Sequence, residues 1–255
     1  MFSKKDSEDL FSRNKLGTFQ LLWDNKTEWF EAPNSGSHEN SWSGVSKITL
    51  EGQDFFIKKQ KNYSKRNLIH PFGENLAQKE HKNITIFKRL NIPSLEAVFF
   101  NRVKKNGNDY AILITKALSS YTPLNEVETL VNTRALNLAA RRTIIFHTAK
   151  LIALSHENKV KIQSLYSKHV FVHDSLIQGQ ACMDNEAPCK FIDLERARLS
   201  YFDKSSFLKD VETFSRRTKS WSQSDRLYFL IHYLGEKKVT QQVRDYINKL
   251  KSISK

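Results

Sequence analysis

Cysteine is scarce in this chain of 255 residues, which contains only Cys182 and Cys189. Two cysteines cannot form the disulfide framework that staples small secreted domains. The segment that holds both, CMDNEAPC, has a spacing unlike that of zinc-binding cysteine pairs, so chance explains it better than a metal site. The scarcity of cysteine favours a reducing cytoplasm as the location of the protein.

Long apolar runs are also absent. No stretch of about 18 consecutive apolar residues occurs, so we expect no helix that spans a bilayer. The first residues, MFSKKDSEDLF, contain no apolar segment of the kind that a secretory signal peptide requires. Aromatic residues are nevertheless plentiful, with 17 Phe, 8 Tyr and 4 Trp. The chain is therefore expected to build a sizeable core, in one large domain or in two lobes that share a cleft.

Acidic residues are outnumbered by basic ones, since 27 Asp and Glu face 41 Lys and Arg, which gives a formal net charge of +14. Such a balance favours an anionic partner: nucleic acid, an anionic membrane surface or a phosphorylated substrate. No helix-turn-helix, zinc-finger or RNA-recognition motif accompanies the charge, so nucleic acid is not expected as the partner. A solvated basic face would account for the charge as well.

The first half of the chain shows strand and hairpin signals around a single helix. Residues 1–18 are polar and are predicted to be flexible, and a polar loop is predicted from Pro33 to Gly44. The other predicted elements are short strands or helical turns at Phe19–Asp24 and Glu28–Ala32, a hairpin of Val45–Leu50 and Asp54–Lys59, a helix at about Asn75–Leu90, and a hairpin of Leu95–Val103 and Tyr110–Thr115. The pattern predicts an antiparallel sheet of about five strands with one helix.

The second half is mainly helical. Val127–Glu157 is predicted to form one or two helices that are apolar nearly all round, as in a core. Two short strands, Val170–Val172 and Phe191–Ile192, follow among loops, and two amphipathic helices close the chain. The fold class is therefore α+β, with a β-rich lobe at 19–116 and a helical lobe at 117–255.

Polar side chains stand at the edges of the two short strands. His169 directly precedes the first strand and Asp193 follows the second. An acid at the end of a buried strand is costly unless a cation or a hydrogen-bond donor meets it. Asp193 is thus the residue whose environment most needs an explanation.

Lys58 and Glu80 form a second candidate pair. Glu80 shares the apolar face of its helix with Ile84 and Phe87, and a carboxylate on a packing face needs a partner. Lys58, which ends the preceding strand, is the natural one. Two alternatives remain. Lys58 could be a charged residue that prevents other strands from pairing with a sheet edge, and Glu80 could lie exposed beside the apolar face of its helix.

In sequence order these residues match the parts of a protein kinase: a glycine-containing loop, a strand Lys, a helix Glu, a loop residue and an Asp after a strand. Phosphoryl transfer requires such residues, because backbone amides and a Lys hold the phosphates and an acid holds the Mg²⁺. The five-residue step from Ser164 to His169 also matches the step from the catalytic Asp to the metal-binding Asn of that loop.

The chain resembles the bacterial lipopolysaccharide kinase family, the Kdo and heptose kinases with WaaP-like and InaA-like branches, and it is most similar to the InaA-like branch. The resemblance runs from about Phe19 to Arg217. The similar stretches are WFEAPN (29–34), SGVSKI (43–48), FFIKKQ (55–60), HPFG (70–73), KEHKNITIFKRLNIP (79–93), LYSKHVFV (165–172) and FIDLERAR (191–198).

The resemblance implies a protein-kinase-like fold of two lobes that uses ATP and Mg²⁺. The residues it assigns are Lys58 for phosphate binding, Glu80 as its ion-pair partner, Ser41, Ser43, Gly44 and Val45 in the loop over the nucleotide, Asp193 as Mg²⁺ ligand, His169 in place of the kinase Asn, and Asp210 as the Asp that tethers the catalytic loop. By local sequence alone, Asp210 is equally well explained as a charge near a helix N-terminus.

Three departures from the kinase pattern bear on activity. Ile162-Gln163-Ser164 replaces His-Arg-Asp, and Ser164 cannot accept a substrate proton as a carboxylate would. The nucleotide loop contains one glycine, Gly44, and a histidine is a poorer Mg²⁺ ligand than oxygen donors are. Because phosphoryl transfer depends mostly on positioning and charge stabilisation, loss of the base need not abolish it.

Two main hypotheses remain. The first is an ATP-dependent kinase that phosphorylates a lipopolysaccharide core sugar, heptose or Kdo, with lipopolysaccharide or another anionic glycolipid as partner at the inner-membrane surface. The second is a pseudokinase of the same fold, a binding or stress-response module, which Ser164 favours. A nucleic-acid-binding protein and a phosphotransferase acting on another small sugar or on protein are weaker alternatives.

Overall fold

The computed structural model describes residues 4–36, 40–65, 73–133, 135–163, 165–183, 185–201 and 204–253. The chain divides into two compact units. The first comprises Met1–Ile86 with Leu95–Ser119, and the second Phe87–Ser94 with Ser120–Lys255. The lobe boundary predicted after residue 116 thus lies close to the end of the first unit at Ser119.

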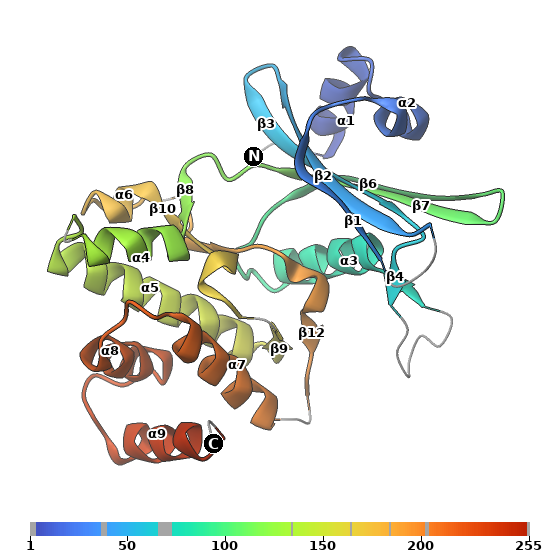
Figure 1. Ribbon diagram of the computed structural model, residues 1–255. Helices are drawn as coiled ribbons and strands as arrows, with labels where there is room; N and C mark the ends of the chain where they lie inside the picture. Colours follow the sequence, from blue (N-terminus) through green and yellow to red (C-terminus); the bar gives the residue numbers. More distant parts are fainter. Residues whose placement is uncertain are drawn as a thin grey trace. The chain divides into compact units, whose positions relative to one another are not determined.

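A five-stranded antiparallel sheet forms the first unit (Figure 1). Its strands, in spatial order, are β1 (Trp29–Ser35), β2 (Trp42–Leu50), β3 (Gln53–Lys61), β7 (Asn108–Lys116) and β6 (Ala97–Lys105). Two tight turns join neighbouring strands, at Glu51-Gly52 and Asn106-Gly107, and all four turn residues have positive φ, which suits the twist of a hairpin. The predicted sheet and hairpins are confirmed.

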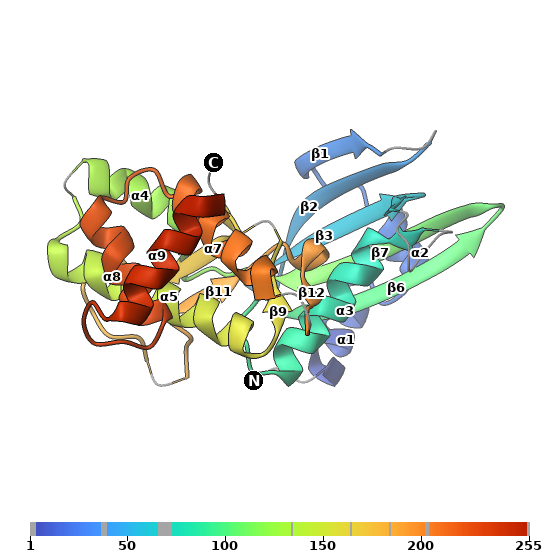
Figure 2. The same ribbon diagram turned by 90° about the horizontal axis from the view of Figure 1, so that it is seen from below.

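Helices lie on both faces of this sheet. Helix α3 (Leu76–Arg89) lies along one face, and α1 (Lys4–Arg13) and α2 (Phe19–Asp24) lie on the other (Figures 1 and 2). A small antiparallel pair, β4 (Ser64–Lys65) and β5 (Glu74–Asn75), precedes α3. The predicted helix at about Asn75–Leu90 agrees with α3 to within one residue at each end.

The N-terminal segment differs from the prediction of a flexible residue range 1–18. Helix α1 forms there, and Leu10 and Phe11 are each 3% exposed. They pack in one core with Ile48, Leu50 and Phe55 of the sheet. The prediction was wrong because it rested on the polar composition of the segment. Two adjacent apolar residues on one face of a helix are enough to attach the segment to the core.

The second unit is mainly helical. Its helices are α4 (Leu124–Asn132), α5 (Leu138–Glu157), α6 (Asp174–Ile177), α7 (Lys204–Arg217), α8 (Gln223–Tyr233) and α9 (Gln241–Ile253). Helix α5 carries buried residues on several sides, among them Ile144, Ile145 and Ile152, as predicted for a core helix. Ser222 and Asp225 form a reciprocal capping box at the start of α8. None of the helices in the described part of the chain combines the length and the apolar character that crossing a membrane requires.

Two small antiparallel sheets carry the loops of interest in the second unit. The first has the order β11 (Cys189–Phe191), β10 (Val170–His173) and β8 (Tyr121–Pro123), and the second pairs β9 (Val160–Lys161) with β12 (Arg198–Leu199). Short 3₁₀ turns at Ser167–His169 and Leu194–Arg196 flank β10 and β11. The two predicted short strands are therefore present and paired with one another.

Candidate active site

The side chains of strand β3 point alternately to the two faces of the sheet, and those on the two faces differ in character. Phe55 and Ile57 point to the face covered by α1, where they are 2% and 0% exposed. Because successive residues of a strand point to opposite faces, Phe56, Lys58 and Gln60 lie on the face that carries α3. One apolar core thus lies on the α1 side of the sheet, and on the other side Lys58 and Gln60 stand beside the buried residues Leu113 and Ala111 of β7.

Lys58 and Glu80 form an ion pair on that face. The Lys58 Nζ lies 2.5 Å from the Glu80 Oε2, and the side chain of Glu80 is only 5% exposed. A carboxylate so deeply buried needs its cation, because removal of one partner of a buried pair typically costs about 3–5 kcal/mol. The pairing expected from the sequence is confirmed, and it holds the ammonium group in one place.

Gln60 links the sheet to α3, the helix that carries Glu80. Its Oε1 accepts a hydrogen bond from the backbone N–H of Ala77 at 2.8 Å, in the first turn of α3. Its Nε2 donates to the Oγ of Ser43 at 3.2 Å. Gln60, which is 1% exposed, therefore joins β2, β3 and the start of α3. Sequence reasoning missed it, although its place two residues after Lys58 puts it on the same face.

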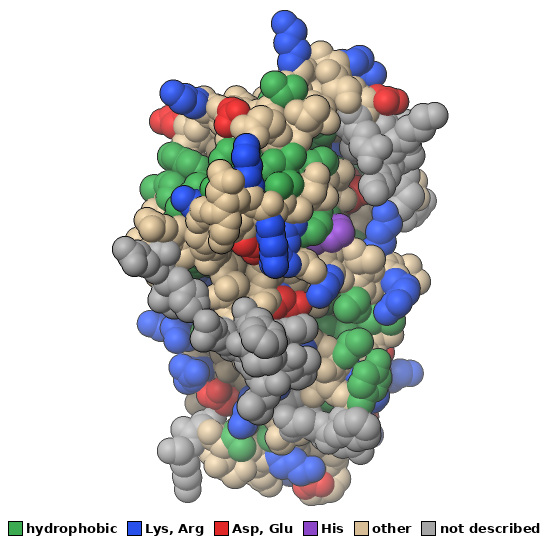
Figure 3. Space-filling view, turned by 90° about the vertical axis from the view of Figure 1, so that its right-hand side faces the viewer, with side chains coloured by type: hydrophobic (Ala, Val, Ile, Leu, Met, Phe, Trp, Pro, Cys, Tyr) green, Lys and Arg blue, Asp and Glu red, His purple; other side chains and the backbone are tan. Residues whose placement is uncertain are grey.

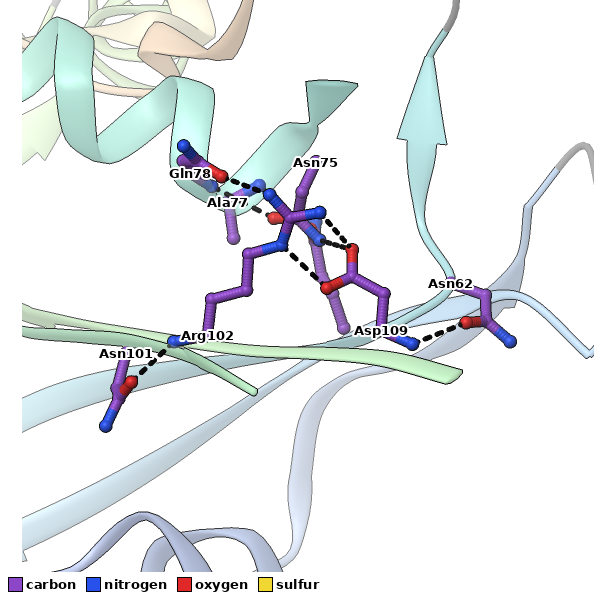
Figure 4. A network of polar contacts seen from close by, with 8 residues as sticks. Asn62, Asn75, Ala77, Gln78, Asn101, Arg102 and Asp109 are labelled. Carbon is purple, nitrogen blue, oxygen red and sulfur yellow. Dashed lines mark hydrogen bonds and ion pairs between the residues drawn. The ribbon is translucent and has the colours of Figure 1, made fainter. Parts of the chain in front are cut away.

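A polar network anchors the beginning of α3 to the β6–β7 hairpin (Figure 4). The guanidinium group of Arg102 makes two bonds to Asp109, at 2.6 and 2.9 Å, and donates to Gln78 Oε1 at 2.5 Å. The side chain of Asn75 accepts from the N–H of Gln78 at 3.0 Å, as a helix N-cap does, and donates weakly to Asp109 at 3.4 Å. The network fixes the helix that carries Glu80.

The predicted nucleotide loop is shorter than expected. Strand β1 extends to Ser35 and β2 begins at Trp42, so Ser43, Gly44 and Val45 belong to a strand rather than to a loop. The alternating burial along β2 from Gly44 onward is the physical reason, since it lets that strand bury one face. Ser41 directly precedes β2 and is 5% exposed, and its carbonyl accepts from the N–H of Gly36 at 2.9 Å. Residues 37–39, between the two strands, lie outside the described residues.

Gly44 has a packing role in this hairpin. A Cβ atom at residue 44 would lie only 2.8 Å from Cζ3 of Trp29 and 3.1 Å from Cγ of Pro33 on the neighbouring strand. Any larger residue would therefore displace Trp29. This close approach of β1 to β2 explains the glycine without a nucleotide.

In the second unit, Asp210 of α7 holds the segment after β9. Its Oδ2 accepts from the N–H of Ile162 at 2.7 Å and its Oδ1 from that of Gln163 at 3.1 Å. Asp210 is 3% exposed, and Gln163 adopts a left-handed conformation with φ of 60°. The tether inferred from the resemblance is thus present as a contact. Ser164, the residue in place of the catalytic Asp, lies outside the described residues.

Two further residues support Asp210. Nε2 of His156 on α5 lies 3.5 Å from Asp210 Oδ2, and its Nδ1 lies 2.8 Å from the hydroxyl of Tyr233 on α8. Burial raises the pKa of Tyr233, so this phenol stays neutral. These contacts join α5, α7 and α8 next to Ile162 and Gln163. No local sequence signal predicted it, because its members come from distant parts of the chain.

Pairing of β10 with β11 brings His169 and Asp193 together. Val170 stands opposite Phe191, and the N–H of Ile192 donates to the carbonyl of His169 at 3.0 Å. The His169 Nε2 consequently lies 3.3 Å from the Asp193 Oδ2. Asp193 has φ of 54°, a left-handed conformation that is uncommon for residues other than glycine. His169 is therefore a side chain within reach of the Asp193 carboxylate.

The two side chains differ in access to solvent. The Asp193 side chain is 40% exposed, whereas that of His169 is 10% exposed. Among the described residues no group of three His, Cys, Asp or Glu side chains is arranged to hold a metal ion. Mg²⁺ in phosphate-transferring sites commonly takes only one or two protein carboxylates and completes its shell with water and phosphate oxygens. An exposed carboxylate such as Asp193 fits that mode of binding.

These features define a protein-kinase-like protein: a five-stranded antiparallel sheet with a Lys–Glu pair, and a helical unit with a tethered loop and an Asp after a short strand. A solved structure described as WaaP in complex with acyl carrier protein has the same fold, with a TM-score of 0.64. The match covers 88% of this chain and 87% of that chain at 17% sequence identity.

The family follows from the sequence match. The model of the lipopolysaccharide kinase (Kdo/WaaP) family matches residues 20–233, so the chain belongs to this family. Protein InaA of Escherichia coli (strain K12) is 21% identical over 184 residues, which cover 72% of this chain and 80% of InaA. The resemblance expected from the motifs is confirmed.

Proposed function

We propose that this protein is an ATP-dependent kinase that phosphorylates a core sugar of lipopolysaccharide, heptose or Kdo. Membership of the lipopolysaccharide kinase family supports the reaction class. The observation that carries the proposal is the Lys58–Glu80 pair, with its separation of 2.5 Å and its buried carboxylate. Because the ion pair already restricts the Lys58 side chain, binding of nucleotide phosphates would cost little further side-chain entropy.

Asp193 and His169 of the second unit are the other residues to which we assign a role. Asp193 would hold Mg²⁺ through its exposed carboxylate, and His169, 3.3 Å away, would orient that carboxylate. Bound Mg²⁺ would neutralise charge on the transferring phosphoryl group. In this proposal His169 acts through Asp193 rather than as a strong ligand itself, since imidazole suits Mg²⁺ poorly.

Asp210 would position the segment next to which we expect the acceptor hydroxyl of the substrate to bind. Its bonds to the backbone of Ile162 and Gln163 hold the two residues directly before Ser164. Ser164 cannot remove the proton of the acceptor as an Asp would. Transfer would then depend on positioning and charge stabilisation, at a rate reduced by the factor of roughly 10²–10⁴ that a general base contributes.

Ser164 also favours a second candidate, a pseudokinase that binds nucleotide without transferring phosphate. The two candidates share Lys58 and Asp193 and differ only in turnover. Measurement of binding and of transfer on the same preparations therefore separates them.

The first test is the thermal shift that Mg²⁺-ATP produces. A ligand that binds the native state stabilises it by about 2.7 kcal/mol at a concentration 100 times its dissociation constant. We expect wild type to shift, and Lys58→Met and Asp193→Ala to lose most of the shift. The control is Lys61→Met, which removes a lysine from the opposite face of the same strand, where it lies 5.8 Å from the centre of the Tyr110 ring.

The second test is transfer of γ-phosphate from labelled ATP to lipopolysaccharide core. Transfer that Lys58→Met abolishes would support the kinase. A thermal shift without any transfer would favour the pseudokinase, and the absence of a shift at millimolar Mg²⁺-ATP would contradict both.

A further inference from the structure

A cavity of about 600 Å³ lies in the second unit. Its wall combines the first turns of α5 with the segment between α6 and β11. None of the described residues that line it has a role in the proposed kinase site. Pockets of several hundred Å³ are of the size that holds a small ligand, so the chemistry of this wall needs an explanation.

Cys182 is one end of a chain of polar contacts beside the cavity. Its Sγ lies 3.4 Å from the Oγ of Ser175, which lies 2.8 Å from the Nδ1 of His173. On the other side of the imidazole ring, Nε2 lies 2.5 Å from the Oε2 of Glu186. Cys182 and Glu186 both line the cavity, whereas His173 is buried. The chain therefore begins and ends at the cavity wall.

The backbone determines where the protons of this chain lie. The N–H of Ser175 donates to the Nδ1 of His173 at 3.2 Å, so Nδ1 is an acceptor and Nε2 carries the ring proton that faces Glu186. The Ser175 hydroxyl then donates to Nδ1 and can accept from the thiol of Cys182. A thiol proton can thus pass through Ser175 to an imidazole that a carboxylate supports. This matters because the thiolate is the nucleophilic form of cysteine.

The imidazole and the segment after Glu186 are held in place by the neighbouring strands. The ring of Tyr121 on β8 meets that of His173 edge to face, with centroids 4.9 Å apart. The Tyr121 hydroxyl donates to the carbonyl of Ala187 and the N–H of His173 to that of Pro188, each at 2.9 Å. The groups of the chain are therefore arranged before any ligand binds.

The start of α5 gives another part of the cavity wall an affinity for anions. Asn137 caps the helix by accepting from the N–H of Ala140 at 2.8 Å, and Asn137, Ala139 and Ala140 all line the cavity. The N–H groups in the first turn of a helix have no partner within the helix, and they attract a carboxylate. The cavity therefore combines a nucleophilic sulfur with a place for a carboxylate.

We propose that this cavity binds a low-molecular-weight disulfide that carries carboxylates, and that Cys182 exchanges with it to form a mixed disulfide. The Cys182 sulfur attacks one sulfur of the ligand, so a new S–S bond forms while the S–S bond of the ligand breaks. The departing thiolate takes up the proton that Ser175 and His173 removed from Cys182. The ligand disulfide is itself the oxidant. The inference is independent of the proposed kinase activity.

The test follows adduct formation on the reduced full chain by mass spectrometry at neutral pH. The probes are glutathione disulfide and the smaller, uncharged hydroxyethyl disulfide, and the chain unfolded in denaturant gives the reference rate for each. We expect the folded chain to react at Cys182 and to favour glutathione disulfide. Cys189 is an internal control, because burial raises the pKa of its thiol to about 12 and keeps it unreactive. Equal modification of both cysteines, or no preference between the probes, would overturn the proposal.

Two variants of Ser175 test the proton path. Ser175→Ala interrupts it, and we expect exchange at Cys182 to slow roughly 10²-fold with both probes, at the lower end of what a general base contributes. Ser175→Thr keeps the hydroxyl and should restore most of the rate. Equal rates in wild type and Ser175→Ala would show that Cys182 reacts as an ordinary exposed thiol.

A third variant tests the cavity. Thr143→Leu enlarges a side chain of the wall and should slow exchange with glutathione disulfide, while the smaller hydroxyethyl disulfide reacts as with wild type. The matched control is Thr129→Leu, the same change at an exposed residue of α4, which should leave both rates unchanged. A wild-type rate with glutathione disulfide in Thr143→Leu would mean that the ligand reacts without occupying the cavity.

Discussion

Glu128 shows how strongly one buried group depends on its surroundings. It lies on α4, is 9% exposed, and has a side-chain oxygen, Oε1, that no hydrogen-bond partner reaches among the described residues. Burial raises the pKa of Glu128 to about 7, although Arg226 and a bond from Ser167 act in the opposite direction. The neutral acid is therefore the form that the fold prefers.

Stability should consequently fall as pH rises past the unfolded-state pKa of this group. Between about pH 4.5 and 7 the folded chain retains a proton that the unfolded chain has released, so the free energy of unfolding decreases through this window. Glu128→Gln stays neutral throughout. We expect it to match wild type in melting temperature near pH 4.5 and to exceed it at pH 8.

The control for this prediction is Glu126→Gln, which changes an exposed residue of the same helix. Its melting temperature should track that of wild type at both pH values. A Glu128→Gln variant that is less stable than wild type at pH 8 would mean that the carboxylate form of Glu128 is stabilising, against the argument from burial.

At the residue scale, the sequence predicted contacts where both partners stand on recognisable elements. Lys58 and Glu80 were predicted to form an ion pair because a carboxylate on the apolar face of a helix needs a cation. Asp193 was predicted to need a cation or a donor, which the resemblance gives as Mg²⁺, and strand pairing brings His169 to 3.3 Å from it. Gln60 was not found because its partner is the backbone N–H of Ala77, which comes within reach only in the folded unit.

At the scale of elements, α3 is the part whose placement matters most. Its apolar face was predicted from the spacing of Ile84 and Phe87, but its anchor was not. Arg102 reaches the helix from β6, and the carboxylate it binds, Asp109, lies on β7. Such a link joins three elements, so no local pattern predicts it.

Arg102→Met should loosen the first turn of α3. The variant removes the bond to Gln78 and leaves the Asp109 carboxylate, 17% exposed, without its guanidinium. Loss of a hydrogen bond to a charged group typically costs about 1.5–3 kcal/mol. We expect faster hydrogen exchange at the amides of Leu76–Lys79 and a weaker thermal shift with Mg²⁺-ATP, because Glu80 follows directly.

The matched control is Lys104→Met, an exposed position on the same strand. It should leave exchange in α3 and the ATP shift as in wild type. Unchanged exchange at the first turn in Arg102→Met would show that the bonds from Gln60 to Ala77 and from Asn75 to Gln78 anchor the helix without Arg102.

Element boundaries were predictable where turn chemistry was local. The residues Glu51-Gly52 and Asn106-Gly107 mark hairpins in the sequence and form them in the structure. Helix α1 and the first residues of β2 were missed for one reason. Each lies in a segment of polar composition, and each is held by a few apolar residues, Leu10 and Phe11 in one case and Trp42 in the other.

The whole molecule is strongly basic, with a net charge of +14. Lys and Arg side chains are spread over the face shown in Figure 3 with Asp and Glu among them, rather than gathered in one patch. A distributed charge attracts anions from a distance without selecting one. This explains why composition predicted an anionic partner and only the family match supported a phosphorylated glycolipid.

Binding to lipopolysaccharide should accordingly weaken as salt is added. The Debye length falls from about 30 Å at 0.01 M to about 8 Å at 0.15 M ionic strength, so the field of a dispersed charge is screened over that range. We expect the affinity for lipopolysaccharide micelles to decrease steeply, and that for micelles of dephosphorylated lipopolysaccharide to be weaker and less dependent on salt. Duplex DNA under the same conditions serves as the competing polyanion. Equal or tighter binding to DNA would contradict the expectation, drawn from the absence of any nucleic-acid motif, that nucleic acid is not the partner.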